Sequence, residues 1–110
     1  MEKFAYSQDQ KLLTWTLAGR YDTFACGKLS EMILGKIAAM RGTDDPSKLL
    51  EEKVVFDFKD VEFVSSSFFR ICISVTKQVK KGNFTIINCN RILENTFTIA
   101  GLEELLSSSN

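Results

Sequence analysis

The chain has 110 residues, the size of one ordinary domain. Fourteen basic and fourteen acidic side chains cancel, so no net field attracts nucleic acid or an anionic membrane, and neither is an expected partner. Hydrophobic residues make up 45% of the sequence, including nine Phe, which is enough for one core. No apolar run approaches 18 residues and no signal-peptide segment follows Met1. We therefore expect a soluble, cytoplasmic protein without direct membrane insertion.

Residue types needed for several kinds of catalysis are missing. The absence of His excludes Ser-His-Asp and Cys-His catalysis and His-ligated zinc. Cys26, Cys72 and Cys89 have no CxxC spacing and predict reduced, mostly buried thiols. Neither of the common Gly-rich phosphate-binding motifs is present. We expect a non-enzymatic domain with no catalytic residues, no metal site and no cofactor.

The first half of the chain predicts two strands and a helix. Residues 4–7 and 12–18 are typical of β-strands, and the polar residues 8–11 suit a hairpin turn. The segment 19–22 is expected to end the second strand, and Asp22 or Thr23 to cap the helix that follows. That helix is predicted to end near Gly42 and to bury one stripe of apolar residues, namely Leu29, Met32, Ile33, Ile37 and Met40.

The second half predicts two further strands and two further helices. After a short helical turn from Asp45 through Leu50, residues 53–58 are typical of a strand covered on both faces. A turn is expected at Lys59 and Asp60, followed by a brief apolar segment over 61–64. A helix over 66–80 has a predicted core stripe of Phe68, Ile71, Cys72, Val75 and Val79.

The last part of the chain predicts a strand, a capped helix and a tail. The strand covers 84–89, and Asn90 is expected to cap the third helix. Its inward residues are predicted to be Ile92, Leu93, Thr96, Phe97 and Ala100. A final helical turn over 102–106 precedes a disordered tail over 107–110.

The order of these elements predicts an α/β fold. Strands that alternate with helices from residue 53 onward imply parallel pairing through right-handed crossovers. The first two strands add an antiparallel part. We expect one domain over 1–106, with a mixed sheet of about four strands and helices packed mainly on one side.

Several motifs, in their order and spacing, resemble the STAS domain family, whose founding members are bacterial anti-sigma factor antagonists. Residues 19–22 (Gly-Arg-Tyr-Asp) resemble the family's Gly-x-x-Asp, and residues 54–58 (Val-Val-Phe-Asp-Phe) its apolar strand with a central Asp. Residues 65–68 (Ser-Ser-Ser-Phe) stand where the family usually has Asp-Ser-Ser-Gly. Residues 100–102 (Ala-Gly-Leu) resemble its Thr-Gly-Leu. The resemblance covers almost the whole chain and implies a single STAS-like domain.

The resemblance also implies a function. In the family, the first Ser of the signature is phosphorylated by an ATP-dependent kinase that is also an anti-sigma factor, and only the unmodified protein binds that kinase. The matching residue here is Ser66, which implies a phosphoacceptor and a protein partner of the anti-sigma factor/serine kinase type. Asp22 matches the family carboxylate that lies near the phosphoacceptor and helps to form the partner surface.

Helical geometry predicts which side chains accompany Ser66. At about 100° per residue, Ser66, Arg70, Ile73 and Lys77 share the helix face opposite the core stripe. Phe69 lies on the flank of that face and is expected to be substantially exposed. The predicted partner surface comprises Asp22, Ser65, Ser67, Phe69, Arg70, Ile73 and Lys77.

Simpler roles are open for the same residues. Ser65 suits a helix N-cap, Ser66 and Ser67 suit a polar first turn, and the Arg70 face suits a solvated surface. A second functional hypothesis is a divergent, non-phosphorylated STAS subunit of a larger, stressosome-like or transporter-associated assembly. Nucleotide binding ranks last because no phosphate-cradling loop is present. The sequence leaves the oligomeric state open.

Overall fold

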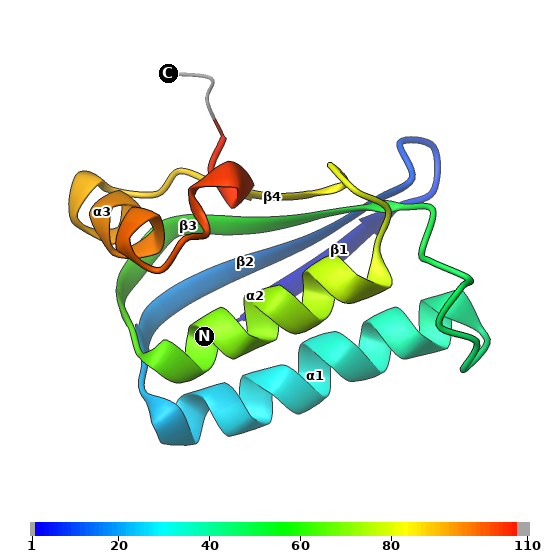
Figure 1. Ribbon diagram of the computed structural model, residues 1–110, viewed down its shortest axis with the longest axis horizontal. Coiled ribbons are helices and arrows are strands. Elements are labelled where there is room, and N and C mark those ends of the chain that lie inside the picture. The colour runs from blue at the N-terminus through cyan, green and yellow to red at the C-terminus, as the bar shows by residue number, and fades with distance from the viewer. Residues whose placement is uncertain (1, 108–110) are drawn as a thin grey trace.

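The computed structural model describes residues 2–107 and has the predicted order of elements (Figure 1). The strands are β1 (Lys3–Ser7), β2 (Leu12–Tyr21), β3 (Lys53–Val64) and β4 (Phe84–Ile87). The helices are α1 (Thr23–Arg41), α2 (Ser66–Gln78) and α3 (Arg91–Ile99), and a 3₁₀ turn, η1, covers Glu103–Leu105. None of the helices within these described residues is long and apolar enough to cross a membrane.

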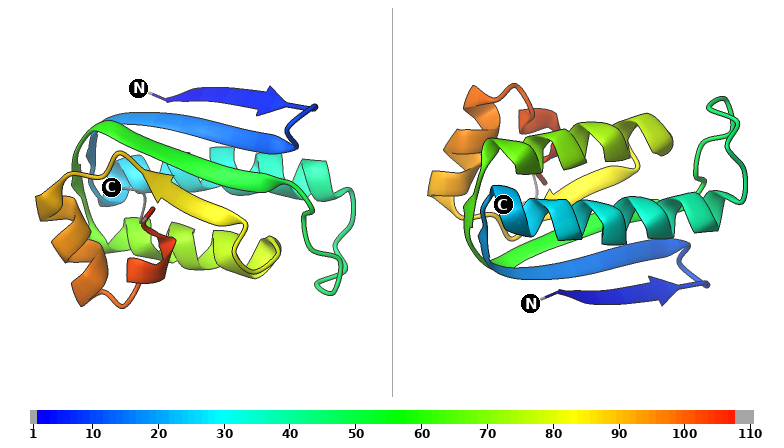
Figure 2. Two further views of the ribbon diagram at one scale, coloured as in Figure 1. Left: turned by 90° about the horizontal axis from the view of Figure 1, so that it is seen from above. Right: turned by 90° about the horizontal axis from the view of Figure 1, so that it is seen from below.

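The four strands form one mixed sheet in the order β1-β2-β3-β4. β1 pairs with β2 antiparallel, whereas β2, β3 and β4 are parallel neighbours. α1 and α2 run side by side across one face of the sheet, and α3 and η1 lie on the β4 side (Figure 2). Seen from above, the strands lie in front of α1 and α2, and neither of these helices covers the opposite face of the sheet (Figure 2). The predicted α/β architecture is confirmed.

An aromatic cluster joins α2 and α3 to the sheet. The Phe68 ring, fully buried on α2, lies 5.4 Å from that of Phe58 and 6.0 Å from that of Phe56, both on β3. It also lies 5.9 Å from the Tyr21 ring on β2 and 6.5 Å from the Phe97 ring on α3. Such ring pairs contribute about 0.5–1.5 kcal/mol beyond the area they bury. Phe68 thus contacts two strands and a second helix from the first turn of α2.

Both strand breaks predicted from local sequence are wrong. β2 continues through Gly19 to Tyr21, and β3 continues through Lys59 and Asp60 to Val64. The predicted break in β2 and the predicted turn in β3 lie opposite each other, since Ala18 pairs with Asp60. The register between the two strands shifts between Thr16 and Ala18 and again between Gly19 and Arg20. Gly19 has a φ of 91°, a conformation that glycine adopts without strain. Hydrogen bonding between the two parallel strands overrides the local turn signals.

Three other elements are shorter than predicted. No helix forms after Pro46, because Leu50 instead bridges to Val79 at the end of α2. The same bridge ends α2 at Gln78 rather than at residue 80. β4 ends at Ile87 because Asn88 takes a left-handed backbone with a φ of 58°.

Three residues expected in the core stripes lie outside them. Met32 is exposed because α1 presents only one row, Cys26-Leu29-Ile33-Ile37, to the core. Ile92 is 77% exposed, and Ala100 is also exposed, because the short α3 buries only Leu93 and Phe97. A narrow contact between a helix and the layer beneath it accounts for these differences.

The C-terminal segment is described only in part. Ser107, expected in the tail, donates its backbone N–H to the Ile86 carbonyl at 3.0 Å. Residues 108–110, the rest of the expected tail, lie outside the described residues.

The cysteines are free thiols, two buried and one half-buried. Burial raises the pKa of Cys72, and burial followed by the Glu94 charge raises the pKa of Cys89 to about 11. Both are therefore protonated at neutral pH, as expected for thiols that serve packing.

Truncation of Phe68 tests the aromatic cluster. We expect Phe68→Ala to lower the free energy of unfolding by about 3–5 kcal/mol, because it leaves a cavity between α2, α3 and the sheet. The matched control is Phe24→Ala on α1, whose ring is 76% exposed, and we expect it to change that free energy by less than about 1 kcal/mol. Urea titration followed by circular dichroism measures both. Equal losses would contradict the role assigned to Phe68.

Candidate functional site

Two strand-to-helix junctions lie side by side at one end of the sheet. β2 and β3 are parallel and end together, with Tyr21 opposite Val64. The Ser65 N–H donates to the Tyr21 carbonyl at 2.9 Å, so the β3–α2 junction is tied to the β2–α1 junction. The same pairing brings Asp22, which follows Tyr21, to the same end of the sheet as Ser66.

Cys26 reinforces this tie from the first turn of α1. Its Sγ lies 3.6 Å from the Tyr21 carbonyl oxygen and 3.6 Å from Ser65 Oγ. Burial raises the pKa of Cys26, the hydrogen bond with Ser65 lowers it, and the negative charge of Asp22 raises it again. The net shift is upward, so Cys26 is a neutral hydrogen-bonding thiol at neutral pH.

The helix that begins at Ser66 has no side-chain cap. Asp22 Oδ1 accepts the Ala25 N–H at 2.8 Å and caps α1, as predicted, and Asn90 Oδ1 accepts the Leu93 N–H at 2.9 Å and caps α3. Ser65 holds the N-cap position of α2, but its hydroxyl makes no capping hydrogen bond and lies beside Cys26 instead. The first N–H groups of α2 thus have no side-chain acceptor like those of the other two helices, and the Phe68 N–H, at the position equivalent to Ala25 and Leu93, donates to the Ser65 carbonyl at 3.0 Å.

The side chains predicted to accompany Ser66 are gathered on one exposed face of α2. Ser66 is the first residue of the helix and is exposed, as are Arg70, Ile73 and Lys77. The first turn contains no acidic residue. Ser66 therefore lies at the positive end of the helix dipole, one turn before Arg70 on the same face, an environment that favours negative charge.

Three members of the predicted surface, Ser65, Ser67 and Phe69, are half-buried, whereas the others are exposed. Phe69 is half-buried rather than substantially exposed, because its ring packs edge-on against Phe97 of α3 at 5.1 Å. Ser67 is also half-buried, on the side of α2 that faces α1. The exposed apolar residue of this face is Ile73, and Phe69 contributes only part of its ring.

A groove between α1 and α2, of about 230 Å³, begins at Ser67, the residue after Ser66. Ser67, Arg70 and Ser74 line it from α2, and Thr23, Gly27 and Ser30 line it from α1. Sequence reasoning missed this α1 wall, although small residues at positions i, i+4 and i+7 of a helix are a readable signal for a shallow face. It also missed Phe24, which is exposed at the start of α1, with Lys28 Nζ 5.3 Å from its ring centre.

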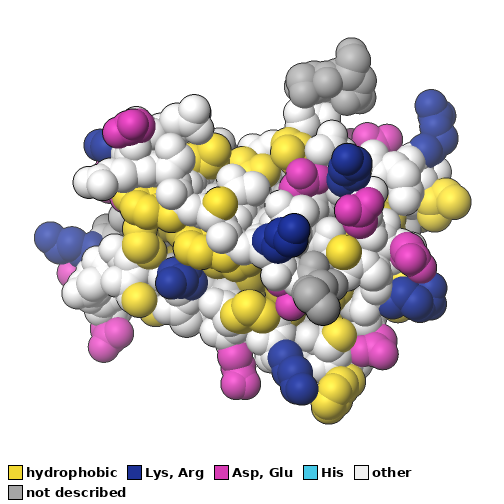
Figure 3. Space-filling view, turned by 180° about the vertical axis from the view of Figure 1, so that it is seen from behind, with side chains coloured by type: hydrophobic (Ala, Val, Ile, Leu, Met, Phe, Trp, Pro, Cys, Tyr) yellow, Lys and Arg dark blue, Asp and Glu magenta, His cyan; other side chains and the backbone are white. Residues whose placement is uncertain are grey.

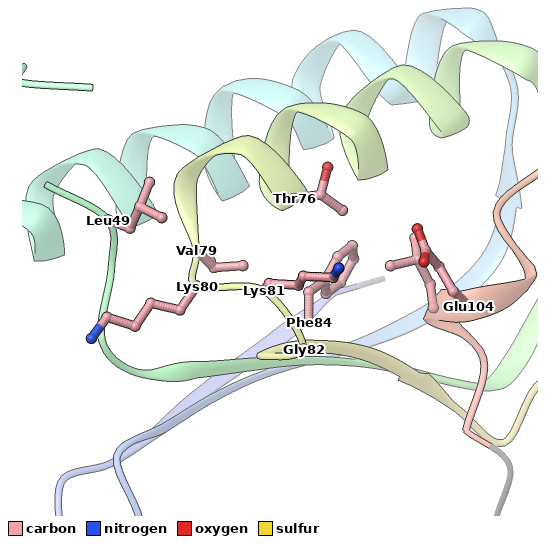
Figure 4. A pocket seen from close by; sticks show the side chains of 9 residues that line it. Leu49, Thr76, Val79, Lys80, Lys81, Gly82, Phe84 and Glu104 are labelled. Carbon is pink, nitrogen blue, oxygen red and sulfur yellow. The ribbon is translucent and has the colours of Figure 1, made fainter. Parts of the chain in front are cut away.

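A second cavity, of about 330 Å³, lies at the opposite end of α2 (Figure 4). Val79, Phe84 and Leu105 form apolar walls, and Lys81 and Glu104 stand at its rim. The Lys80 side chain points away from it and pairs with Glu51 at 3.0 Å. This cavity is separate from the Ser66 site, because α2 is 13 residues long and the two features lie at its two ends.

The family sequence model of the STAS domain matches residues 4–109. The chain therefore belongs to the STAS domain family. Among curated proteins, no sequence is similar enough to be matched to this chain.

Solved structures show the same fold at low sequence identity. The anti-sigma factor antagonist SpoIIAA in its unphosphorylated form is 13% identical, with a TM-score of 0.76 over 100% of this chain and 89% of that one. The phosphorylated form of the Bacillus cell fate determinant SpoIIAA, also 13% identical, has a TM-score of 0.68 over 100% and 92% of the two chains. An anti-sigma factor antagonist from Mycobacterium paratuberculosis, 16% identical, has a TM-score of 0.72 over 99% and 87%.

Alanine substitution tests the difference between the caps. We expect Asp22→Ala to lower the free energy of unfolding by about 0.5–2 kcal/mol, because the Ala25 N–H loses its partner. Ser65→Ala should lower it by less, because the Ser65 hydroxyl caps no N–H. Urea titration of the two variants measures this difference. A larger loss for Ser65→Ala would show that its hydroxyl caps α2 in solution.

Proposed function

We propose that this chain is a regulatory, non-enzymatic protein-interaction module that docks on an anti-sigma factor/serine kinase and is switched by phosphorylation of Ser66. The observation that carries the proposal is the environment of Ser66, an exposed hydroxyl at a helix start without a side-chain cap and without an acidic residue in its first turn. Membership of the STAS family and the fold shared with anti-sigma factor antagonists support it.

The partner surface combines charge with modest apolar area. Between Phe63 and Leu93 the chain has five basic residues and no acidic one, and two of the five, Arg70 and Lys77, lie on the face of α2, which therefore offers cations to an acidic partner. Ile73 supplies an exposed apolar contact, and Ser65, Ser67 and Phe69 contribute their accessible parts. Asp22 lies at the neighbouring junction, where its carboxylate also caps α1.

A phosphate on Ser66 would change this surface in two ways. It adds a charge of about −1.5 to −2 at neutral pH, which offsets most or all of the positive charge that Arg70 and Lys77 give the α2 face. It also places acceptor oxygens one helical turn from Arg70, within reach of that guanidinium. Modification and docking on an acidic partner then compete for the same cation.

Binding measurements test the proposed switch. The probes are purified anti-sigma factors with the ATPase-type kinase fold, encoded in the genome that encodes this chain. We expect one of them to bind the unmodified chain and, with ATP, to add one phosphate to Ser66. Calorimetry should then show that this kinase binds the phosphorylated chain at least about tenfold more weakly than the unmodified chain. Ser66→Ala should bind without being modified, and Thr76→Ala, which removes an exposed hydroxyl outside the groove on the same helix, should behave as the unaltered chain.

The outcome also separates the two functional hypotheses. If no such kinase binds or modifies the chain, the switch is wrong. Recovery of the chain from its native cell within a stable complex of other STAS proteins, without phosphate, would instead support the structural-subunit hypothesis.

The role of Arg70 has its own test. Phosphorus NMR titration of the chain phosphorylated at Ser66 should give a second phosphate pKa below the usual value of about 6, because the helix start and Arg70 favour the dianion. Arg70→Ala should raise that pKa. The control Lys77→Ala should leave the pKa unchanged, because Lys77 lies about three helical turns from Ser66. Coincident titrations of the Arg70 variant and the unaltered chain would show that Arg70 does not contact the phosphate.

A further inference from the structure

The strand β1 forms an open edge of the sheet, at a distance from the Ser66 site. It pairs with β2 alone among the described residues 2–107, so alternate N–H and C=O groups point outward from its other edge. The strand contains neither Pro nor a register shift, and Lys3 is its one charged residue. Devices that usually protect an edge strand from pairing are therefore few.

Two aromatic rings accompany this edge. Phe4 and Tyr6 stand opposite Trp15 and Leu13, on the face of the sheet that the helices cover. Phe4 is 38% and Tyr6 42% exposed, although the Phe4 ring lies 4.7 Å from that of Trp15. Hydrophobic side chains gather on this side of the molecule when it is seen from behind (Figure 3). The edge thus offers apolar surface together with unpaired backbone.

Each of the two rings has a charged companion, and the two charges differ in sign. Lys36 Nζ, from α1, lies 5.0 Å from the centre of the Phe4 ring. Glu52 Oε2, from the segment before β3, accepts the Tyr6 hydroxyl at 3.4 Å. A cation thus marks the position of Phe4, and a carboxylate marks that of Tyr6.

We propose that β1 pairs antiparallel with β1 of a second copy of this chain, with the two-fold axis at Ala5. This register places Phe4 of each copy opposite Tyr6 of the other, and such cross-strand aromatic pairs stabilise a sheet. It also brings Lys36 of each copy toward Glu52 of the other, so opposite charges meet twice. The interface is self-complementary, as a two-fold dimer requires, and it joins the two sheets into one.

The proposed dimer leaves the α2 face accessible. Seen from below, α1 runs between α2 and the β1 edge (Figure 2). A dimer of this kind therefore presents two Ser66 sites to partners, and its existence does not depend on the function proposed for those sites.

Cysteine cross-linking tests the register. In this dimer the two Ala5 side chains face each other across the axis, at the Cβ separation of directly opposed residues, which a disulfide can span. Ala5→Cys should therefore form a covalent dimer rapidly with copper-phenanthroline as the oxidant. Lys3→Cys is the matched control, on the same face of the same strand, and stands opposite Ser7 rather than itself. Equal rates for the two variants, or rates no higher than that of the unaltered chain with its three native thiols, would overturn the register.

Charge reversal tests the interface without cross-linking. Sedimentation equilibrium of the unaltered chain should show a reversible monomer–dimer equilibrium. Lys36→Glu should raise the dissociation constant about tenfold, because like charges meet at two symmetric positions, and Glu52→Lys should do the same. The double variant with both changes should restore it. A chain that stays monomeric up to millimolar concentration, or a double variant as weak as the single ones, would overturn the proposal.

Discussion

The burial of Phe68 is the constraint on which the arrangement of this molecule depends. One ring at the start of α2 contacts β2, β3 and α3 together, so it holds the helix start against the sheet and against the C-terminal helix. STAS signatures usually have Gly at this position, yet the ring points into the core and leaves Ser66 exposed. A bulky residue in the signature therefore strengthens the scaffold of the site without covering its hydroxyl.

Parallel pairing decides what lies beside that hydroxyl. Because β2 and β3 run in the same direction and end together, the start of α1 and the start of α2 meet at one edge. The hydrogen bond from the Ser65 N–H to the Tyr21 carbonyl holds the two helix starts together, and the Ser65 hydroxyl lies 3.6 Å from Cys26 Sγ instead of capping α2. The start of α2 thus lacks a side-chain cap, and the hydroxyl that could supply one contacts a residue 39 positions away in the sequence.

Much of the fold was predictable because its signals are local and repeated. Periodicity placed each strand and helix, and short polar residues placed the caps at Asp22 and Asn90. Prediction failed where a distant segment outweighs local preference. β3 pairs with β2 through Gly19, and α3 covers the ring of Phe69. Neither contact can be predicted from the local sequence alone, because the partner is distant in the chain.

For the site, the sequence by itself determined which side chains share a face of α2, because 100° per residue is a property of any α-helix. It also determined, through the order of its motifs, the family and the candidate phosphoacceptor. Only the tertiary structure decided that the Ser65 hydroxyl does not cap α2, that small residues of α1 line a groove that begins at Ser67, and that β1, with its two aromatic rings, is an edge strand of the sheet formed by residues 2–107. These features depend on which elements become neighbours, and that is set by burial of the whole apolar surface rather than by any stretch of residues.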